Sequence, residues 1–161
     1  MEFKNDAYCG LYCGSCFVVQ GAKDNQQEEI IPIYKNYLQL EKEDIKCQGC
    51  KSKGYVFKGC RNCQIRTCAE SKKVEFCFEC SEFPCDKVER FKNSKLAHTF
   101  MAVQNLSKIK EMGKDAWLKE QEIRWKCTNC GKEFSWIAEN CSQCGEPVYN
   151  SIKEKNDFLK K

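Results

Sequence analysis

Cysteine is the residue type in this chain whose number and spacing could support chemistry, and the chain contains 15 of them. Six repeat one spacing, C-x2-C-x4-C, first over Cys60–Cys68 and again over Cys77–Cys85. The linker between the two copies is polar and has no apolar run long enough to form a core. Thiolates on a tetrahedral zinc ion would hold such a segment, because a structural zinc site contributes about 10–16 kcal/mol of apparent binding free energy. The repeat therefore predicts that metal binding stabilises the fold.

The C-terminal cysteines have the spacing C-x2-C-x10-C-x2-C, which is typical of a zinc ribbon. They are Cys127, Cys130, Cys141 and Cys144. Gly131 and Gly145 follow the two pairs directly, and glycine permits the positive φ that a tight cysteine knuckle needs. The motif predicts one zinc site with four cysteine ligands within residues 126–150.

The cysteines of residues 1–112 can be grouped in two ways. The linear grouping gives one site to Cys47, Cys50, Cys60 and Cys63, gives a second to Cys68, Cys77, Cys80 and Cys85, and leaves Cys9, Cys13 and Cys16. In the rival grouping each C-x2-C-x4-C set supplies three ligands and takes its fourth from Cys47, Cys50 or the N-terminal set. The spacing fits both groupings, and both stay open.

His98 is the only histidine, and with the 15 cysteines it would complete four tetrahedral sites. A lone helical histidine can also be an ordinary packed or surface residue. The set Cys9, Cys13 and Cys16 therefore either takes His98 as its fourth ligand or keeps an open coordination position, as catalytic metals do. We expect three to four zinc ions in total.

The compartment and the charge also bear on the metal hypothesis. The N-terminus has no apolar signal-peptide core, and no stretch approaches the length of a membrane span, so we expect a cytoplasmic protein. Thiols stay reduced there and cluster as metal ligands rather than disulfides.

The formal net charge of +4 suggests an anionic partner. That excess of positive charge disappears if the thiolates hold four divalent ions, because the total then becomes about −3.

Apolar periodicity and helix-start signals predict several helices. Pro32 is tolerated only in a first turn, so the helix within Asp24–Asp44 should begin near Ile31. The others are a short helix at Phe17–Val19 with Ser15 as N-cap, the longest helix at Asp86–Met112, and a short helix at Lys114–Arg124. A helix start after Ser15 would favour the thiolate forms of Cys13 and Cys16.

Together these elements predict a small α+β metal-stabilised fold, with helices around cysteine knuckles followed by a C-terminal β zinc ribbon. The expected organisation is a cysteine-rich helical metal-binding domain over 1–112, a helical linker over 113–125, the ribbon over 126–150 and a polar, frayed tail over 151–161.

Several segments together resemble a known family. They are CGLYCGSC from Cys9, the segments CQGC, CRNC and IRTCA, and CFECSEFPC from Cys77. They look like the cysteine-rich bacterial and archaeal family named domain of unknown function 3795, and NLSKIKEMG and WLKEQEIRWKC are similar to its longer members. The resemblance implies a metal-binding cytosolic protein of a prokaryote. It implies no activity and no catalytic residue.

Three functions follow from the cysteine pattern, and the first is a zinc-stabilised module that recognises another macromolecule, a protein rather than a nucleic acid. No Ser-His-Asp, paired-carboxylate or phosphate-loop pattern is present, which favours a role other than catalysis without excluding an enzyme.

The second function is an iron–sulfur or redox protein that uses Cys9, Cys13 and Cys16, since thiolates hold both zinc and iron–sulfur clusters. The third is nucleic-acid binding through the ribbon. Aromatic and basic residues lie close together there, namely Phe134, Trp136 and Tyr149 with Arg124, Lys126 and Lys132. The alternative for Phe134 and Trp136 is that they form the small core of the ribbon.

Overall fold

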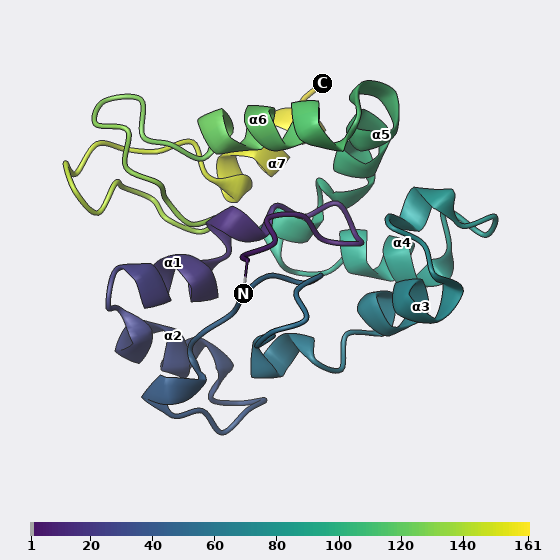
Figure 1. The fold of residues 1–161 in the computed structure, drawn as a ribbon. Helices are drawn as coiled ribbons and strands as arrows, with labels where there is room; N and C mark the ends of the chain where they lie inside the picture. Colours follow the sequence, from purple (N-terminus) through teal and green to yellow (C-terminus); the bar gives the residue numbers. More distant parts are fainter. Residues whose placement is uncertain (1) are drawn as a thin grey trace.

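The fold of this protein is known from a computed structural model, which describes residues 2–161. It is mostly helical (Figure 1), and its α-helices are α1 (Phe17–Lys23), α2 (Gln27–Tyr34), α3 (Gln64–Lys72), α4 (Asp86–Lys92), α5 (Ala102–Met112), α6 (Lys114–Arg124) and α7 (Ser151–Leu159). Short 3-10 turns lie between them: η1 (Cys13–Ser15), η2 (Lys42–Asp44), η3 (Lys58–Cys60), η4 (Cys77–Glu79) and η5 (Ala97–Thr99). Within residues 2–161, none of the helices has the length and apolar composition that a membrane-spanning segment requires.

The predicted β ribbon is not observed as a sheet. Residues 126–150 form two long loops, and their only β pairing within the described chain consists of the isolated bridges Lys126↔Glu133 and Asn140↔Pro147. The ladder does not continue because the segment between the cysteine pairs bonds elsewhere. Trp136 N donates to Ser15 O (2.9 Å), and Trp136 O accepts from Ser151 N (2.9 Å). The fold class is therefore a small, mostly helical, cysteine-rich fold rather than the expected α+β arrangement.

Helix α2 begins at Gln27, so the expected start near Ile31 is wrong. Glu28 and Glu29 lie in its first turn, where the helix dipole favours negative charge. Pro32 lies inside the helix, and the helix ends two residues later, at Tyr34. Proline thus marks the end of this helix rather than its beginning, because the missing N–H weakens only the last turn.

The single long helix expected over Asp86–Met112 is two helices, α4 and α5, with η5 between them. Hydroxyl groups cause the interruption. Ser94 Oγ accepts from Leu96 N (3.2 Å) and lies 2.7 Å from Thr99 Oγ1, which in turn donates to Leu96 O (2.8 Å). These hydroxyl groups form hydrogen bonds with backbone groups, and such bonds compete with the hydrogen bonds of a continuous helix.

Two short helices agree with the sequence predictions, and the C-terminal tail does not. Helix α1 begins at Phe17, although its N-cap is Cys16 rather than Ser15, and the helix predicted at Lys114–Arg124 is α6. The tail expected to be frayed is α7, which Asn150 caps by accepting from Lys153 N (3.1 Å). The polar composition of residues 151–161 did not indicate that Asn150 caps a helix there.

One hydrophobic core connects the N-terminal cysteines with the C-terminal loops. In Figure 1 the N-terminal loop runs through the middle of the molecule, with α1 and α2 on one side, α3 and α4 on another, and α5, α6 and α7 along the top. Trp117 on α6 is fully buried and meets the ring of Tyr12 edge-on at 6.3 Å. The division of the chain at residues 113–125 stays a prediction.

Candidate metal centre

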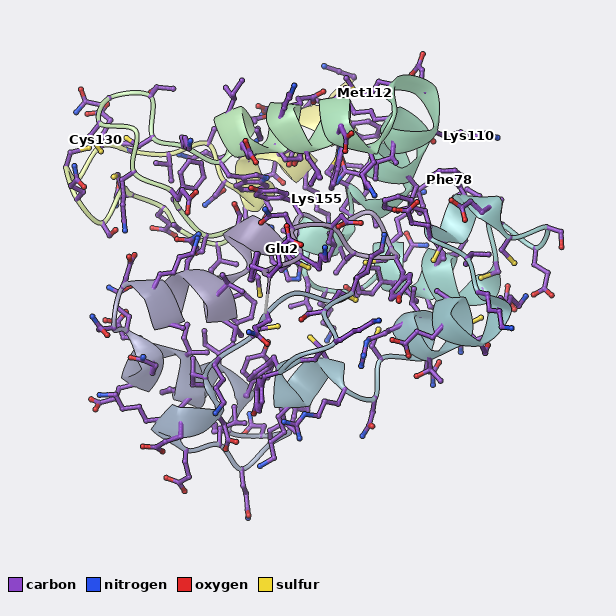
Figure 2. The ribbon with its side chains drawn as sticks, in the orientation of Figure 1. Glu2, Phe78, Lys110, Met112, Cys130 and Lys155 are labelled. Atoms are coloured by element: carbon purple, nitrogen blue, oxygen red, sulfur yellow. The ribbon has the colours of Figure 1, made fainter. Side chains whose placement is uncertain are left out.

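The ribbon centre consists of Cys127, Cys130, Cys141 and Cys144, whose sulfur atoms all lie within 4.8 Å of one another. The sulfur atoms of Cys127 and Cys144 are 3.6 Å apart, and those of Cys130 and Cys141 are 3.5 Å apart. Zn–S bonds of about 2.3 Å in a tetrahedron require S···S separations of about 3.8 Å. The four thiols therefore fit a metal ion, and Figure 2 shows Cys130 at the outer end of the loops that carry them.

Two copies of one backbone turn build this centre. Cys127 N donates to Lys132 O (2.8 Å), and Cys141 N donates to Glu146 O (2.8 Å). Each bond closes a turn around one C-x2-C pair, so the four sulfur atoms meet between the two turns. Because the turns are local, a short stretch of sequence is enough to specify them.

The glycine after each cysteine pair has the positive φ that its position in the sequence predicts. Gly131 and Gly145 both have φ of +76°, and their amides donate to the carbonyls of Cys127 (2.8 Å) and Cys141 (3.0 Å). An L side chain is strained at this φ, which explains why glycine closes both turns.

Hydrogen bonds lower the pKa of two thiols of the ribbon centre, which favours the thiolate form that binds a cation. The Asn129 side chain, with a backbone amide, lowers the pKa of Cys144 to about 6, and backbone amides also lower the pKa of Cys141. The Lys132 amide acts on Cys130 in the same direction, but burial and the neighbouring thiols raise its pKa to about 12. Four close thiolates repel one another, and a divalent ion removes that repulsion.

The cysteines of residues 1–112 differ from the ribbon centre in the effect of burial on their pKa and in the distances between their sulfur atoms. Cys9 and Cys13 are buried, and burial raises their pKa well above the ordinary value. Among residues 2–161, the ribbon centre is the only group of three or more His, Cys, Asp or Glu residues whose ligand atoms lie within 4.8 Å of one another. Metal ligation by the N-terminal cysteines therefore stays a prediction.

The structure gives the three cysteines of the C-x3-C-x2-C set, Cys9, Cys13 and Cys16, different cysteine neighbours. Cys50 is the thiol that most strongly raises the pKa of Cys9 and of Cys13, and the Cys50 amide lies against the Cys13 sulfur. Cys16 lies instead near Cys47. The three thiols thus face two different partners from the next cysteine pair, and these neighbours cross the boundaries of the linear grouping.

The pKa of Cys16 corrects one expectation. The backbone amides of Val18 and Val19 at the start of α1 lower it, but burial dominates and raises it to about 11. Burial penalises the charged form more than the first helical turn favours it. Without a cation, Cys16 is a neutral thiol at neutral pH rather than an activated nucleophile.

A second set of four cysteines lines one small hollow of about 20 Å³, which we call the thiol hollow. Its sulfur-bearing residues are Cys68, Cys77, Cys80 and Cys85. Burial, followed by the charges of the three other thiols, raises the pKa of Cys77 to about 12. Lys72 Nζ donates to Cys80 Sγ (3.3 Å), a contact that the sequence did not signal because eight residues separate them.

His98 lies in η5, and its ring is surrounded by aromatic side chains. It stacks on Trp136 with 4.4 Å between ring centroids and meets Phe17 edge-on at 6.3 Å. Burial lowers its pKa to about 4, so the ring is neutral at physiological pH. No described contact among residues 2–161 joins it to a cysteine sulfur, and ligation by His98 stays a prediction.

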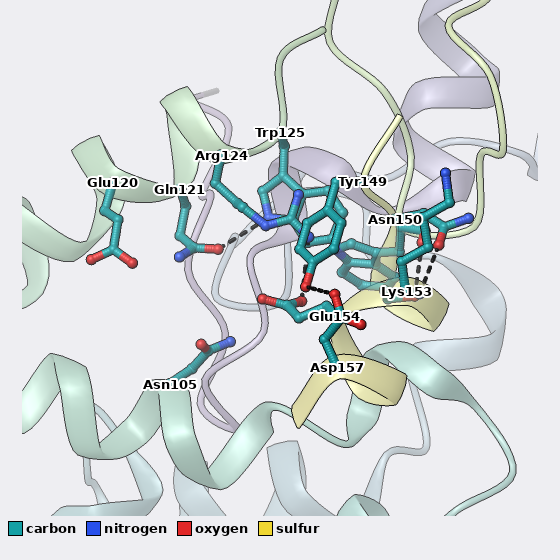
Figure 3. Close-up of polar contacts among 12 residues, drawn as sticks. Asn105, Glu120, Gln121, Arg124, Trp125, Tyr149, Asn150, Lys153, Glu154 and Asp157 are labelled. Carbon is teal, nitrogen blue, oxygen red and sulfur yellow. Dashed lines mark hydrogen bonds and ion pairs between the residues drawn. The ribbon is translucent and has the colours of Figure 1, made fainter. Parts of the chain in front are cut away.

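Most of the aromatic and basic residues near the ribbon contact other parts of the molecule, and Figure 3 shows Arg124 and Tyr149 among them. Phe134 and Trp136 are buried. Arg124 lies over the rings of Trp125 (4.1 Å) and Tyr149 (4.8 Å) and pairs with Glu154 (3.4 Å). Their position supports the core role for Phe134 and Trp136 and leaves Arg124 poorly placed to contact a phosphate.

Comparison with known proteins gives one result. The family model "Protein of unknown function (DUF3795)" matches residues 5–90, which include all eleven cysteines before the ribbon centre. No curated protein and no solved structure matched the chain. The ribbon centre lies outside the matched residues. Since the match covers more than half of the chain, this protein belongs to the DUF3795 family, whose function is unknown.

Proposed function

We propose that this chain is a zinc-binding protein of the prokaryotic cytoplasm, in which thiolate-bound zinc holds a surface that recognises another protein. The observation that carries the proposal is the ribbon centre, with four sulfur atoms within 4.8 Å of one another. Thiolate sulfur is the ligand that structural zinc sites prefer. When bound, zinc would supply cross-linking of the two loops and no reaction step.

Metal content tests this proposal. Protein purified without oxygen and without a metal-binding tag should contain zinc, and Cys127→Ser/Cys130→Ser should contain one equivalent less. Ser151→Ala, which removes a hydroxyl that donates to Trp136 O at 2.7 Å, is a control that leaves all sulfur ligands in place. Equal zinc content in the Cys127→Ser/Cys130→Ser variant and the parent would contradict the proposal.

The recognition role is supported by a cleft of about 470 Å³ between α1, α2 and the ribbon loops. We call it the acidic cleft. Its carboxylates are Asp24, Glu29 and Glu133, and apolar side chains lie beside them, namely Ile30, Ile33 and Ile137. A volume of this size suits side chains of a partner.

The charge of the acidic cleft favours a basic protein segment over a nucleic acid. Asp24 pairs with Lys132 (2.5 Å) and Glu133 with Lys23 (2.8 Å), whereas Glu29 has no ion pair within residues 2–161. Cys141 also lines the cleft, and four thiolates on one zinc ion would add a charge of about −2 beside it. Phosphate would be repelled, and a Lys or Arg side chain would be attracted.

The acidic cleft is tested with a labelled peptide of alternating lysine and leucine as the probe. In an NMR titration we expect amide shifts at Glu29 and Ile33, and weaker binding after Glu29→Lys. Glu111→Lys on α5 makes the same charge change at an exposed position away from the cleft and is the control. Equal loss in both variants would show only general charge attraction and would contradict the assignment.

A further inference from the structure

The thiol hollow joins three elements of the family-matched part of the chain. Cys68 lies on α3, Cys77 begins η4, Cys80 follows η4 directly, and Cys85 is the N-cap of α4. Four cysteines from three elements thus line one partly open hollow. A hollow lined by four potential ligands differs from a lone cysteine, because together they can fill a tetrahedral coordination shell.

The size of the thiol hollow limits what can occupy it. Its volume of about 20 Å³ holds roughly one water-sized sphere. The sulfur atoms of the thiol hollow lie farther apart than those of the ribbon centre, which are within 4.8 Å of one another. Zinc, with Zn–S bonds of about 2.3 Å, would therefore draw the four sulfur atoms inward around a single ion.

The surroundings of the hollow match those of a structural metal. Apolar side chains line it beside the thiols, namely Ile65, Ala69, Val74, Phe83 and Val88. Lys72 Nζ donates to Cys80 Sγ (3.3 Å) and pairs with Glu82 (2.8 Å). The Lys72 ammonium thus lies where it would offset part of the negative charge of a zinc-bound Cys80 sulfur.

The backbone fixes the cysteine pair that faces α3. Cys80 N donates to Cys77 O (3.2 Å), which closes a tight turn, and Cys77 N donates to Tyr8 O (3.0 Å). The second bond ties this turn to the N-terminal loop in the middle of the fold. An ion in the hollow would therefore connect α3, α4 and the N-terminal loop.

We infer that Cys68, Cys77, Cys80 and Cys85 form a second structural zinc centre, in which the Cys80 sulfur accepts a hydrogen bond from Lys72. This inference rests on the proposed function in that both assign zinc to thiolates, but it names a separate site in a separate part of the chain. On binding, one Zn²⁺ replaces the thiol protons, which pass to solvent.

Matched variants separate the two centres. Cys77→Ser/Cys80→Ser should lose one zinc equivalent and keep the zinc of the ribbon centre, and Cys127→Ser/Cys130→Ser should show the reverse. If the hollow variant keeps the full zinc content while the ribbon variant loses one, only this inference is overturned. If the ribbon variant loses none, the proposed function fails instead. Iron with inorganic sulfide lost from the hollow variant would overturn the single-ion assignment.

The unmodified protein provides a test that does not depend on a variant folding. Alkylation followed by mass spectrometry should show Cys68, Cys77, Cys80 and Cys85 becoming reactive together as a chelator withdraws zinc. Equal alkylation rates with and without the chelator would overturn the inference.

Lys72 is tested as a positioning residue. Lys72→Met should weaken zinc binding at the hollow about 10-fold in chelator competition, because partners of metal ligands typically contribute that much. Lys53→Met removes the same charge at an exposed position and should leave the affinity unchanged. An unchanged affinity in Lys72→Met would overturn the assigned role of Lys72.

Discussion

The ribbon centre and the N-terminal cysteines bring thiols together by different means. In the ribbon centre, two local turns within residues 127–144 place four sulfur atoms within 4.8 Å of one another. In the N-terminal part, the neighbours come from distant segments, as with Cys13, which is buried, and Cys50, which is half-buried. The difference shows that local backbone geometry is enough to form one centre, whereas the other thiols depend on the core around them.

The two regions also differ in their protonation. Cys144 has a pKa lowered to about 6 by hydrogen bonds to its sulfur, whereas burial raises the pKa of Cys9 and Cys13. A ligand thiol must lose its proton when a metal binds. The ribbon centre is thus partly prepared for a cation, and a cation at the buried thiols must offset a larger desolvation cost.

The largest expected effect is that of removing all metal. A strong chelator should remove most of the helical circular dichroism signal of the protein, because a structural zinc site contributes about 10–16 kcal/mol to folding. Re-addition of zinc is the control and should restore the signal. A chelated protein that is free of metal and keeps its full helical signal would mean that the apolar core alone holds the fold.

The next largest effect is expected at the junction of the two regions. Trp136→Ala removes the ring that stacks on His98 and should cost about 3–5 kcal/mol in urea unfolding. The zinc of the ribbon centre should remain, because the knuckle turns do not depend on this ring. Tyr37→Ala, at a side chain that is 83% exposed, is the control and should have almost no effect.

The pH dependence should have opposite signs in the two regions of the metal-free protein, which is kept folded for this measurement by a stabilising osmolyte. The lowered pKa of Cys144 stabilises the fold at high pH, and this contribution is lost as the pH falls through about 6. The raised pKa of Cys16 stabilises the fold at low pH, and this contribution is lost as the pH rises toward about 11.

Alkylation measures this contrast. At pH 7 Cys144 should react rapidly, whereas only about one in 10⁴ Cys16 side chains is a thiolate. Urea-unfolded protein is the control, in which the two rates should converge. Equal rates in the folded, metal-free protein would contradict the burial argument.

The smallest effect is expected for the ion pairs between the ribbon loops and α1. Glu133→Gln breaks the 2.8 Å pair with Lys23, and both side chains are partly exposed. Such pairs contribute about 0.2–1 kcal/mol, so the urea midpoint should change little and zinc content should not change. A loss of zinc from this variant would show that the ribbon centre depends on its docking to α1.

The cysteine types and spacings were enough to predict the ribbon centre, because its ligands and turn glycines lie within one short segment. The helix at Lys114–Arg124 was also predictable from its pattern. The start of α2, the break between α4 and α5 and the helix at the C-terminus were not. The position of α2 depends on a proline that lies in its last turn rather than its first. The break between α4 and α5 depends on the hydroxyls of Ser94 and Thr99, and the C-terminal helix depends on its cap at Asn150.

Sequence by itself determined that this is a cysteine-rich chain of its family with a candidate four-cysteine centre near its end, because both properties are encoded in local residue order. Only the tertiary structure decided which of the remaining thiols are neighbours, that His98 stacks on Trp136, and that Lys72 faces Cys80. These contacts join segments whose separation in the sequence carries no periodic signal. Packing of the apolar core, and not spacing along the chain, brings them together.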